Sequence, residues 1–289
     1  MTWLTWRIER SALLSAAALV AVFALVALLL NANDSSDMNT ARTLLELGPA
    51  AFATVVAVFW GAPTVAREYE QRTYLLVWSR ERSATRWLAA RVAHLLAPLV
   101  VLTVVVNLIA NLLQTKLLST LQPTPAVGPF DYDLWLPLQL LTVIAGFGLG
   151  VLVGVLVRNS VLAMGITLVV YVVLRFVLAV FVRPHLVPPV RLLDDTPSPA
   201  GSIGAGSGYL DRAGNQVSIP DVQRMCLSDN SKAAYDQCLA RNGITHEYLD
   251  VEPAYRIPDV RLIELGIYVA LAVVVFAAAW LVLRRRTVS

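Results

Sequence analysis

The sequence predicts an all-α integral membrane protein with six transmembrane helices, both termini in the cytoplasm, and a small disulfide-bridged extracytoplasmic domain between helices 5 and 6. Three observations support this fold class. First, 57% of the 289 residues are apolar and 15% are charged, whereas soluble domains carry roughly 45–50% apolar and about 25% charged residues. Second, six apolar runs are each long enough to cross a bilayer. Third, the segments that join these runs differ in their content of arginine.

A spanning helix needs about 20 mainly apolar residues. Six segments meet this requirement, namely residues 11–30, 47–65, 92–113, 134–157, 161–182 and 262–283. The first segment is preceded by Arg7 and Arg10, and the apolar region of a signal peptide is likewise preceded by basic residues. Its apolar run is longer than the roughly 7–15 residues of a signal peptide, and it has no clear small-x-small cleavage site, so we expect it to be retained. The predicted domains are 1–182 with an inner loop at 66–91, then 183–261, then 262–289.

The charges of the joining segments predict the orientation. The inner segments 1–10, 66–91, 158 and 284–289 carry twelve Arg and four Glu, or +8, and the outer segments 31–46, 114–133 and 183–261 carry ten basic and fifteen acidic residues, or −5. Because basic residues are retained preferentially on the cytoplasmic side, both termini are expected there. The net charge of +3 is therefore interpreted as a consequence of membrane orientation, and no nucleic-acid partner is predicted.

The sequence carries no nucleotide-binding or catalytic motif, so no enzymatic activity is expected. A P-loop requires Gly-Lys before Ser or Thr, but neither Lys116 nor Lys232 follows a glycine. The glycine-rich run 201–208 follows a Pro/Asp/Ser loop and is interpreted as a flexible linker. No metal site is predicted, because none of the three histidines stands at ligand spacing from another His or Cys: His94, His185 and His246.

The segment 183–261 forms the predicted outer domain and contains both cysteines, Cys226 and Cys238. The oxidising outer side of a membrane permits a disulfide between them. Pro220 and Ser231 are placed to begin two short helices. We therefore expect a disulfide-bridged helical hairpin, and two free thiols are the alternative.

The inner loop 66–91 combines six Arg and three Glu with Trp78 and Trp87. Its composition leaves two interpretations open. One is an interfacial amphipathic segment that anchors and orients the protein, and the other is a docking surface for a cytoplasmic partner.

Motifs around this loop resemble a known family. The most specific stretches are Phe59-Trp60-Gly61-Ala62-Pro63, Ala66-Arg67-Glu68-Tyr69-Glu70, Thr73, Trp78 and Arg86-Trp87-Leu88. Weaker similarity continues through Phe130-Asp131, Gly146 to Gly154, Arg158, Met164, Arg175, Arg183-Pro184-His185-Leu186, Tyr255-Arg256, Glu264, Gly266 and Tyr268. Together these stretches resemble the ABC-2-type permease subunits of ABC transporters that are common in actinobacteria. Arg72 replaces the glycine of the family's usual Glu-x-Gly-Thr, and Arg91 stands where Lys is frequent.

The resemblance implies a permease subunit of an ABC transporter, expected to be an exporter, in the plasma membrane of a high-GC bacterium. A separate ATPase subunit, which binds ATP and Mg, is expected to dock beneath a homo- or heterodimer of permeases embedded in membrane lipid, and this chain itself is expected to bind no cofactor. The implied ATPase-coupling residues are Arg67, Glu68, Glu70, Arg72, Thr73, Trp78, Arg80, Arg86 and Trp87.

Polar residues inside the predicted spans form two stripes. Residues that recur every four positions share one face of a helix. Such stripes either line a translocation path or form hydrogen bonds between helices. The stripes are Thr103, Asn107 and Asn111 in the third span, and Thr167, Tyr171 and Arg175 in the fifth.

Two further patterns concern charge and packing. We add Glu264 to the candidate translocation path, which already contains Arg175. Both residues lie near the outer boundary of the membrane, where their side chains either pair with each other or snorkel to the surface. Gly146, Gly150 and Gly154 form a stripe of small residues that predicts close packing with another helix.

Two other function classes compete with the transporter subunit. A membrane-anchored sensor or assembly protein would use its outer domain to bind a partner. A proton-coupled secondary transporter has little support, because no Asp lies in any predicted span and Glu264 is peripheral.

Overall fold

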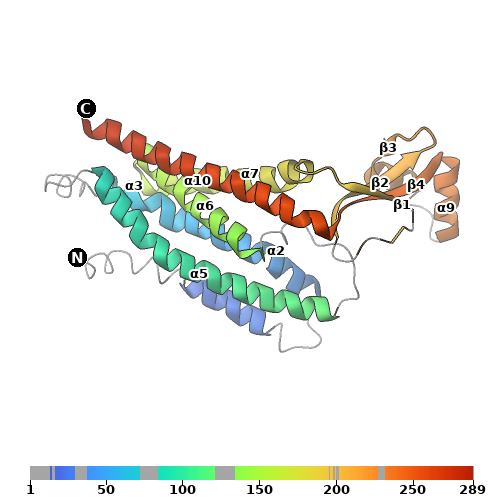
Figure 1. The fold of residues 1–289 in the computed structure, drawn as a ribbon, viewed down its shortest axis with the longest axis horizontal. Coiled ribbons are helices and arrows are strands. Elements are labelled where there is room, and N and C mark those ends of the chain that lie inside the picture. The colour runs from blue at the N-terminus through green and yellow to red at the C-terminus, as the bar shows by residue number, and fades with distance from the viewer. Residues whose placement is uncertain are drawn as a thin grey trace. The chain divides into compact units, whose positions relative to one another are not determined.

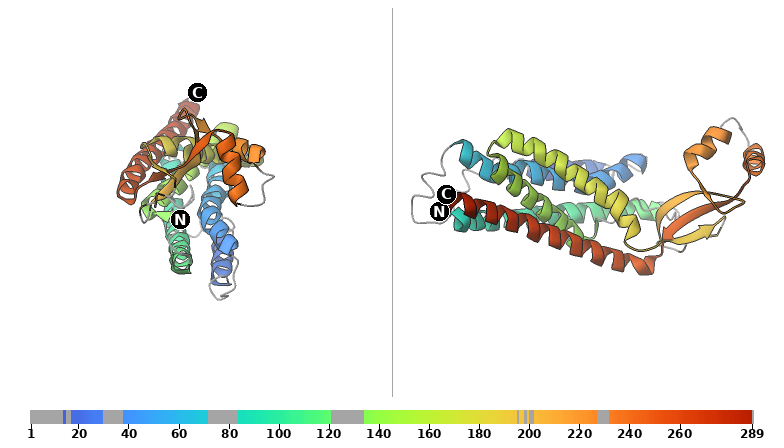
Figure 2. Two further views of the ribbon diagram at one scale, coloured as in Figure 1. Left: turned by 90° about the vertical axis from the view of Figure 1, so that its right-hand side faces the viewer. Right: turned by 90° about the horizontal axis from the view of Figure 1, so that it is seen from above.

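The structure is a computed structural model that describes residues 14, 17–29, 38–71, 84–120, 134–194, 196–197, 199, 202–226 and 232–288. The described residues form two compact units (Figures 1 and 2). The helical unit lies within Met1–Gln122, Phe130–Phe181 and Arg261–Ser289, and the sheet unit lies within Val182–Val260. Each unit is considered by itself.

Within the described residues, five helices are long and apolar enough to cross a membrane. They are Thr43–Glu70, Thr85–Thr115, Leu136–Val157, Ser160–Val182 and Ile257–Arg285. They coincide with the second to sixth predicted spans, which confirms a mostly helical, multi-pass membrane protein. A shorter apolar helix, Ala17–Leu29, falls within the first predicted span. Apart from Leu14, the other residues of that span lie outside the described part of the chain.

The second span combines three helical segments, α2 (Met38–Val55), the π-helical η1 (Val56–Gly61) and α3 (Ala62–Glu70). In the π turn the N–H of Ala62 donates to the carbonyl of Ala57, five residues earlier. Pro63 explains this widening, because proline has no N–H to donate and its ring clashes with the carbonyl four residues back. The fifth span also contains a π-helical segment close to a proline. Its α7 (Ser160–Phe176) continues as the π-helical η3 (Val177–Val182), which ends shortly before Pro184.

The third span is α5 (Ala84–Thr120) and the fourth is α6 (Leu136–Val157). A two-residue turn, Arg158-Asn159, joins α6 to α7. Arg158 adopts the left-handed conformation with φ 60° and ψ 7°, and its N–H donates to the carbonyl of Gly154 at 3.2 Å. The side chain of Asn159 accepts the N–H of Leu162 at 2.9 Å and thereby caps α7. Such a short connection makes α6 and α7 antiparallel neighbours.

Helix α6 lies at the centre of the helical unit. Segments α2, η1, α3, α5 and α7 all contact it, and Val275 and Phe276 of α10 (Ile257–Val288) lie next to its Gly148. Most of its residues are buried, whereas α7 and α10 expose rows of large apolar side chains such as Val161 and Val273. In a bilayer, those exposed faces are in contact with acyl chains or other apolar surfaces.

The sheet unit contains a four-stranded antiparallel sheet in the order β1-β4-β2-β3. Its elements are η4 (Arg183–His185), β1 (Val190–Leu193), β2 (Ile203–Asp211), β3 (Gln216–Val217), α8 (Ile219–Cys226), α9 (Lys232–Arg241), β4 (Ile244–Glu252) and η5 (Ala254–Arg256). The flexible linker predicted for 201–208 is therefore wrong, because most of that run belongs to β2. Backbone groups form the ladder whatever the side chain, and Gly208 leaves room for the ring of Tyr248 on the neighbouring strand.

The predicted disulfide between Cys226 and Cys238 is confirmed, with a Cα–Cα distance of 5.8 Å. It joins α8 to α9, so the two predicted short helices and their bridge are present. The domain is more than the predicted helical hairpin, however, because these helices accompany the four-stranded sheet, for which the sequence carries no clear pattern. Tyr235 of α9 and Tyr209 of β2 bring their hydroxyl groups within 3.1 Å of each other.

A polar turn closes the connection from β2 to β3. The carboxylate of Asp211 accepts the backbone N–H groups of Ala213 and Asn215, each at 2.8 Å. Hydrogen bonds from the Asn215 side chain and from the turn backbone lower the pKa of Asp211 below its ordinary value. Gly214 occupies the turn with φ +83°, which side-chain-bearing residues rarely adopt.

Replacing Cys226 and Cys238 with Ser should destabilise the sheet unit. The two cysteines are 12 residues apart, and a cross-link of about this span stabilises a fold by about 3 kcal/mol in the chain-entropy model. Hydrogen exchange on the full chain in detergent should show faster exchange in α8 and α9 and no change in α6. Mass spectrometry after alkylation without reduction provides the check, because two alkylated cysteines in the wild-type protein would contradict the bridge.

Candidate functional site

The end of α3 forms a charged pair with the start of α5. Nη1 of Arg91 lies 2.5 Å from Oε1 of Glu68, and the two side chains are only 15% and 16% exposed. The guanidinium of Arg91 also lies 5.2 Å from the ring centre of Trp87, one turn earlier on α5. Because the pair is largely removed from water, salt screens it less than a surface pair. It therefore holds the end of α3 against α5.

The next two residues of α3 contact the turn between α6 and α7. The guanidinium of Arg158 lies 5.0 Å from the ring centre of Tyr69. The hydroxyl of Ser160 donates to Oε2 of Glu70 at 2.7 Å. Ser160 is the first residue of α7, so the Glu70 carboxylate lies at a helix N-terminus, where negative charge is favourable.

Three adjacent residues of α3 thus contact three separate segments of the helical unit. We call this group the α3 cluster: Glu68, Tyr69, Glu70, Arg91, Arg158 and Ser160. It lies at the end of the unit where α3 ends, α5 begins and α10 ends (Figures 1 and 2). Its ion pair, hydrogen bond and cation–π contact link α3 to α5 and to the turn between α6 and α7.

The structure places five of the nine predicted coupling residues. Glu68 and Glu70 belong to the α3 cluster, Trp87 stacks on Arg91, and Arg67 and Arg86 are exposed near the ends of their helices. The others lie outside the described residues: Arg72, Thr73, Trp78 and Arg80. Sequence reasoning did not assign Tyr69, Arg158 or Ser160 to this site, because the contacts cross about 90 residues of chain and leave no local spacing signal. The isolated Arg158 between two apolar spans was the signal available.

The polar stripe on α5 faces α6. Nδ2 of Asn107 donates to Oε1 of Gln139 at 2.7 Å and to the carbonyl of Leu134 at 2.8 Å. Nδ2 of Asn111 donates to the carbonyl of Asn107 at 2.8 Å. The hydroxyl of Thr103 donates to its own helix, to the carbonyl of Leu99 at 2.7 Å. Gln139 was not singled out from the sequence, although a lone amide inside an apolar span is a visible signal.

The polar stripe on α7 faces α6 and α10. Thr167 and Tyr171 are buried, and the hydroxyl of Tyr171 donates to the carbonyl of Thr142 on α6 at 3.4 Å. Nη1 of Arg175 donates to the hydroxyl of Tyr268 on α10. These contacts lie between helices, and the role of either stripe in lining a path stays a prediction.

Glu264 is 2% exposed and lies one helical turn before Tyr268 on α10. Residues four apart share a helix face, so Glu264 and the hydrogen-bond partner of Arg175 lie on the same side of α10. The direct pairing of Arg175 with Glu264 stays a prediction.

The glycines of α6 lie against the second span. A Cβ at Gly150 would meet the carbonyl of Ala57 and the N of Ala62, and a Cβ at Gly154 would meet the carbonyl of Ala62. From the opposite side, a Cβ at Gly61 would lie 2.5 Å from the carbonyl of Phe147. The two backbones thus approach as only small residues allow. We call this contact between Gly150, Gly154, Ala57, Gly61 and Ala62 the glycine seam.

The third glycine of the α6 stripe has a different neighbour. A Cβ at Gly146 would lie 2.7 Å from the ring of Tyr171 and 3.4 Å from the Cβ of Ala57. Gly146 therefore provides the space in which the Tyr171 ring packs between α6 and α7.

Comparison with known families identifies one match. Residues 26–183 match the model of the family described as ABC-2 membrane transporter related. The match covers more than half of the chain and includes the α3 cluster and the glycine seam. A comparison with curated proteins finds no match.

Gly150→Ala should destabilise the helical unit. Its new methyl group would meet the backbone of η1 and α3, and such overpacking costs about 1–3 kcal/mol. This exceeds the roughly 1 kcal/mol by which Ala is the better helix former. Thermal unfolding in detergent should show a lower midpoint. Gly165→Ala on α7 is the control, because a Cβ there meets nothing within 4 Å; equal midpoints for the two variants would argue against the close approach.

Proposed function

The chain belongs to the ABC-2 membrane transporter related family, and from this premise we propose that it is the permease subunit of an ATP-driven exporter in the cell membrane. A separate ATPase subunit binds ATP and Mg and docks on the loop between α3 and α5. The α3 cluster is the observation that supports this docking site, because it connects the base of that loop to α5, to the turn after α6 and to the start of α7.

The proposal places the α3 cluster on the cytoplasmic side of the membrane. The inner segments defined from the sequence carry twelve Arg, which favours that orientation. The guanidinium of Arg284 lies 5.3 Å from the ring centre of Trp280 near the end of α10. Indole and guanidinium groups of this kind are typical of the membrane–water interface. The sheet unit then lies on the outer side, where an oxidising environment preserves its disulfide.

In the proposed mechanism, closure of the ATPase on nucleotide displaces the loop and with it the end of α3. Glu68, Tyr69 and Glu70 hold three other segments, so a displacement of α3 moves these segments together. Movement of packed helices in response to a bound partner is a common form of allosteric transmission. We further propose that two permeases, identical or similar, assemble through their apolar faces.

The docking site predicts a loss of binding when its positive charge is reversed. Arg67 and Arg86 are both exposed, so Arg67→Glu combined with Arg86→Glu should leave the fold intact. Co-purification of the ATPase subunit should fall by about tenfold, which corresponds to about 1.4 kcal/mol. Arg224→Glu, at an exposed position of the sheet unit, is the control. Undiminished co-purification of the ATPase with the double variant would argue against docking at this loop.

Transmission through the α3 cluster predicts a charge-swap effect. Arg91→Glu or Glu68→Arg alone places like charges at the contact that now measures 2.5 Å, and each should uncouple ATP hydrolysis from transport. The double swap restores opposite charges, so it should recover part of the coupling, with an interaction energy of about 0.5–3 kcal/mol. The amount of substrate transported per ATP hydrolysed by the reconstituted complex measures this at constant ATPase occupancy. Additive effects of the two substitutions would show that the pair does not transmit.

A further inference from the structure

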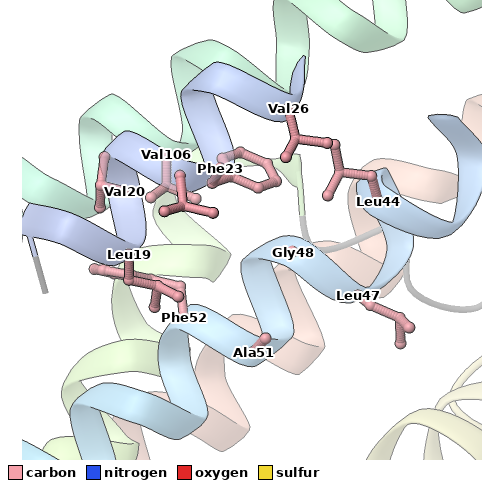
Figure 3. A pocket seen from close by; sticks show the side chains of 11 residues that line it. Leu19, Val20, Phe23, Val26, Leu44, Leu47, Gly48, Ala51, Phe52 and Val106 are labelled. Atoms are coloured by element: carbon pink, nitrogen blue, oxygen red, sulfur yellow. The ribbon is translucent and has the colours of Figure 1, made fainter. Parts of the chain in front are cut away.

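An apolar cavity of about 250 Å³ lies between the helix Ala17–Leu29, α2 and α5 (Figure 3). None of its eleven lining residues carries a charged or hydrogen-bonding side chain. Phe23 and Phe52 are buried in its walls, whereas Val22 and Leu47 are 58% and 54% exposed. Among the described residues, the cavity is therefore open on the side of Val22 and Leu47.

The sequence explains why this space stays open. Leu44, Gly48 and Ala51 follow a helical spacing and share one face of α2. A Cβ at Gly48 would collide with the ring of Phe23, so the ring rests directly on the backbone of α2 (Figure 3). The ring holds the two helices apart at this point, and the short side chain of Ala51 does not fill the space beside it.

The lining and its position determine the class of ligand. A polar ligand would lose its hydrogen bonds in this space, and a water molecule needs two to four polar partners, which the lining does not supply. An empty cavity would forfeit the dispersion contacts of its walls. The walls contributed by α2 and α5 belong to the membrane-spanning stretches Thr43–Glu70 and Thr85–Thr115. In a bilayer, apolar side chains on such stretches face hydrocarbon, and we take this as the medium at the mouth of the cavity.

We propose that this cavity binds an acyl chain of a bilayer phospholipid. A single flexible chain can fill a space of this size along its length, whereas a helix of a second copy, about 10–12 Å across, could insert only single side chains. The bound chain contacts the helix Ala17–Leu29, α2 and α5 at once, and so fills the gap between them. The assignment does not depend on ATP-driven transport, and its test requires no ATPase.

The test quantifies phospholipid that stays bound to the full chain. The protein is extracted in a mild detergent, washed, and analysed by native mass spectrometry. Ala51→Phe and Val26→Phe each place a ring in the cavity from opposite walls, and Ala277→Phe is the matched control at an exposed position on α10. Wild type and control should retain about one phospholipid per chain, and both cavity variants should retain at least roughly tenfold less.

A second measurement separates loss of the site from loss of the fold. Adding 1-palmitoyl-2-oleoyl-phosphatidylethanolamine to the delipidated proteins should raise the unfolding midpoint of wild type and control but not of Ala51→Phe. Without lipid, Ala51→Phe should unfold no earlier than wild type, because its ring replaces the missing contacts. Equal lipid retention by wild type and both cavity variants, or no retention by wild type, would overturn the proposal.

Discussion

The close approach of α6 to the second span is the contact on which the helical unit depends. At Gly150 and Gly61 the two backbones meet without intervening side chains, and the π turn before Pro63 supplies one of the contacting carbonyls, that of Ala57. In lipid, apolar side chains gain little from leaving their surroundings, so helices associate through such tight packing and through buried polar contacts. The motif around Trp60 and Pro63, which looked like a sequence signature, is thus also a packing device.

The glycine seam positions the α3 cluster. Gly154 packs against Ala62, and its carbonyl accepts the N–H of Arg158 in the turn to α7. That turn brings the guanidinium of Arg158 over Tyr69. Displacing α6 from the second span would therefore move Arg158 away from its partner. The contact of Arg158 with Tyr69 in the α3 cluster thus depends on the packing of the glycine seam.

The sequence predicted features that depend on local pattern, and it missed those that depend on pairing across the chain. Hydropathy identified five spans whose helices the structure contains, and the isolated Arg158 marked the turn between two of them. The disulfide was predictable because only two cysteines are present. The sheet was missed because the glycines of β2 carry no strand propensity, and their ladder with β4 requires residues about 40 positions away. Gln139 was missed as the partner of Asn107 for the same reason.

Helix α5 contributes residues to the α3 cluster, to the polar contact with α6 and to the apolar cavity. Arg91 belongs to the α3 cluster, Asn107 bonds to α6, and Val106 lines the apolar cavity. Adjacent residues point about 100° apart around a helix, so Val106 and Asn107 face different neighbours. Pro98 lies between the cluster and these two residues and cannot donate to the carbonyl four residues earlier. Helix α5 therefore lacks one backbone hydrogen bond at Pro98, and beyond that point the hydrogen bonds of Asn107 to Gln139 and to the carbonyl of Leu134 fix it against α6 and the residues before it.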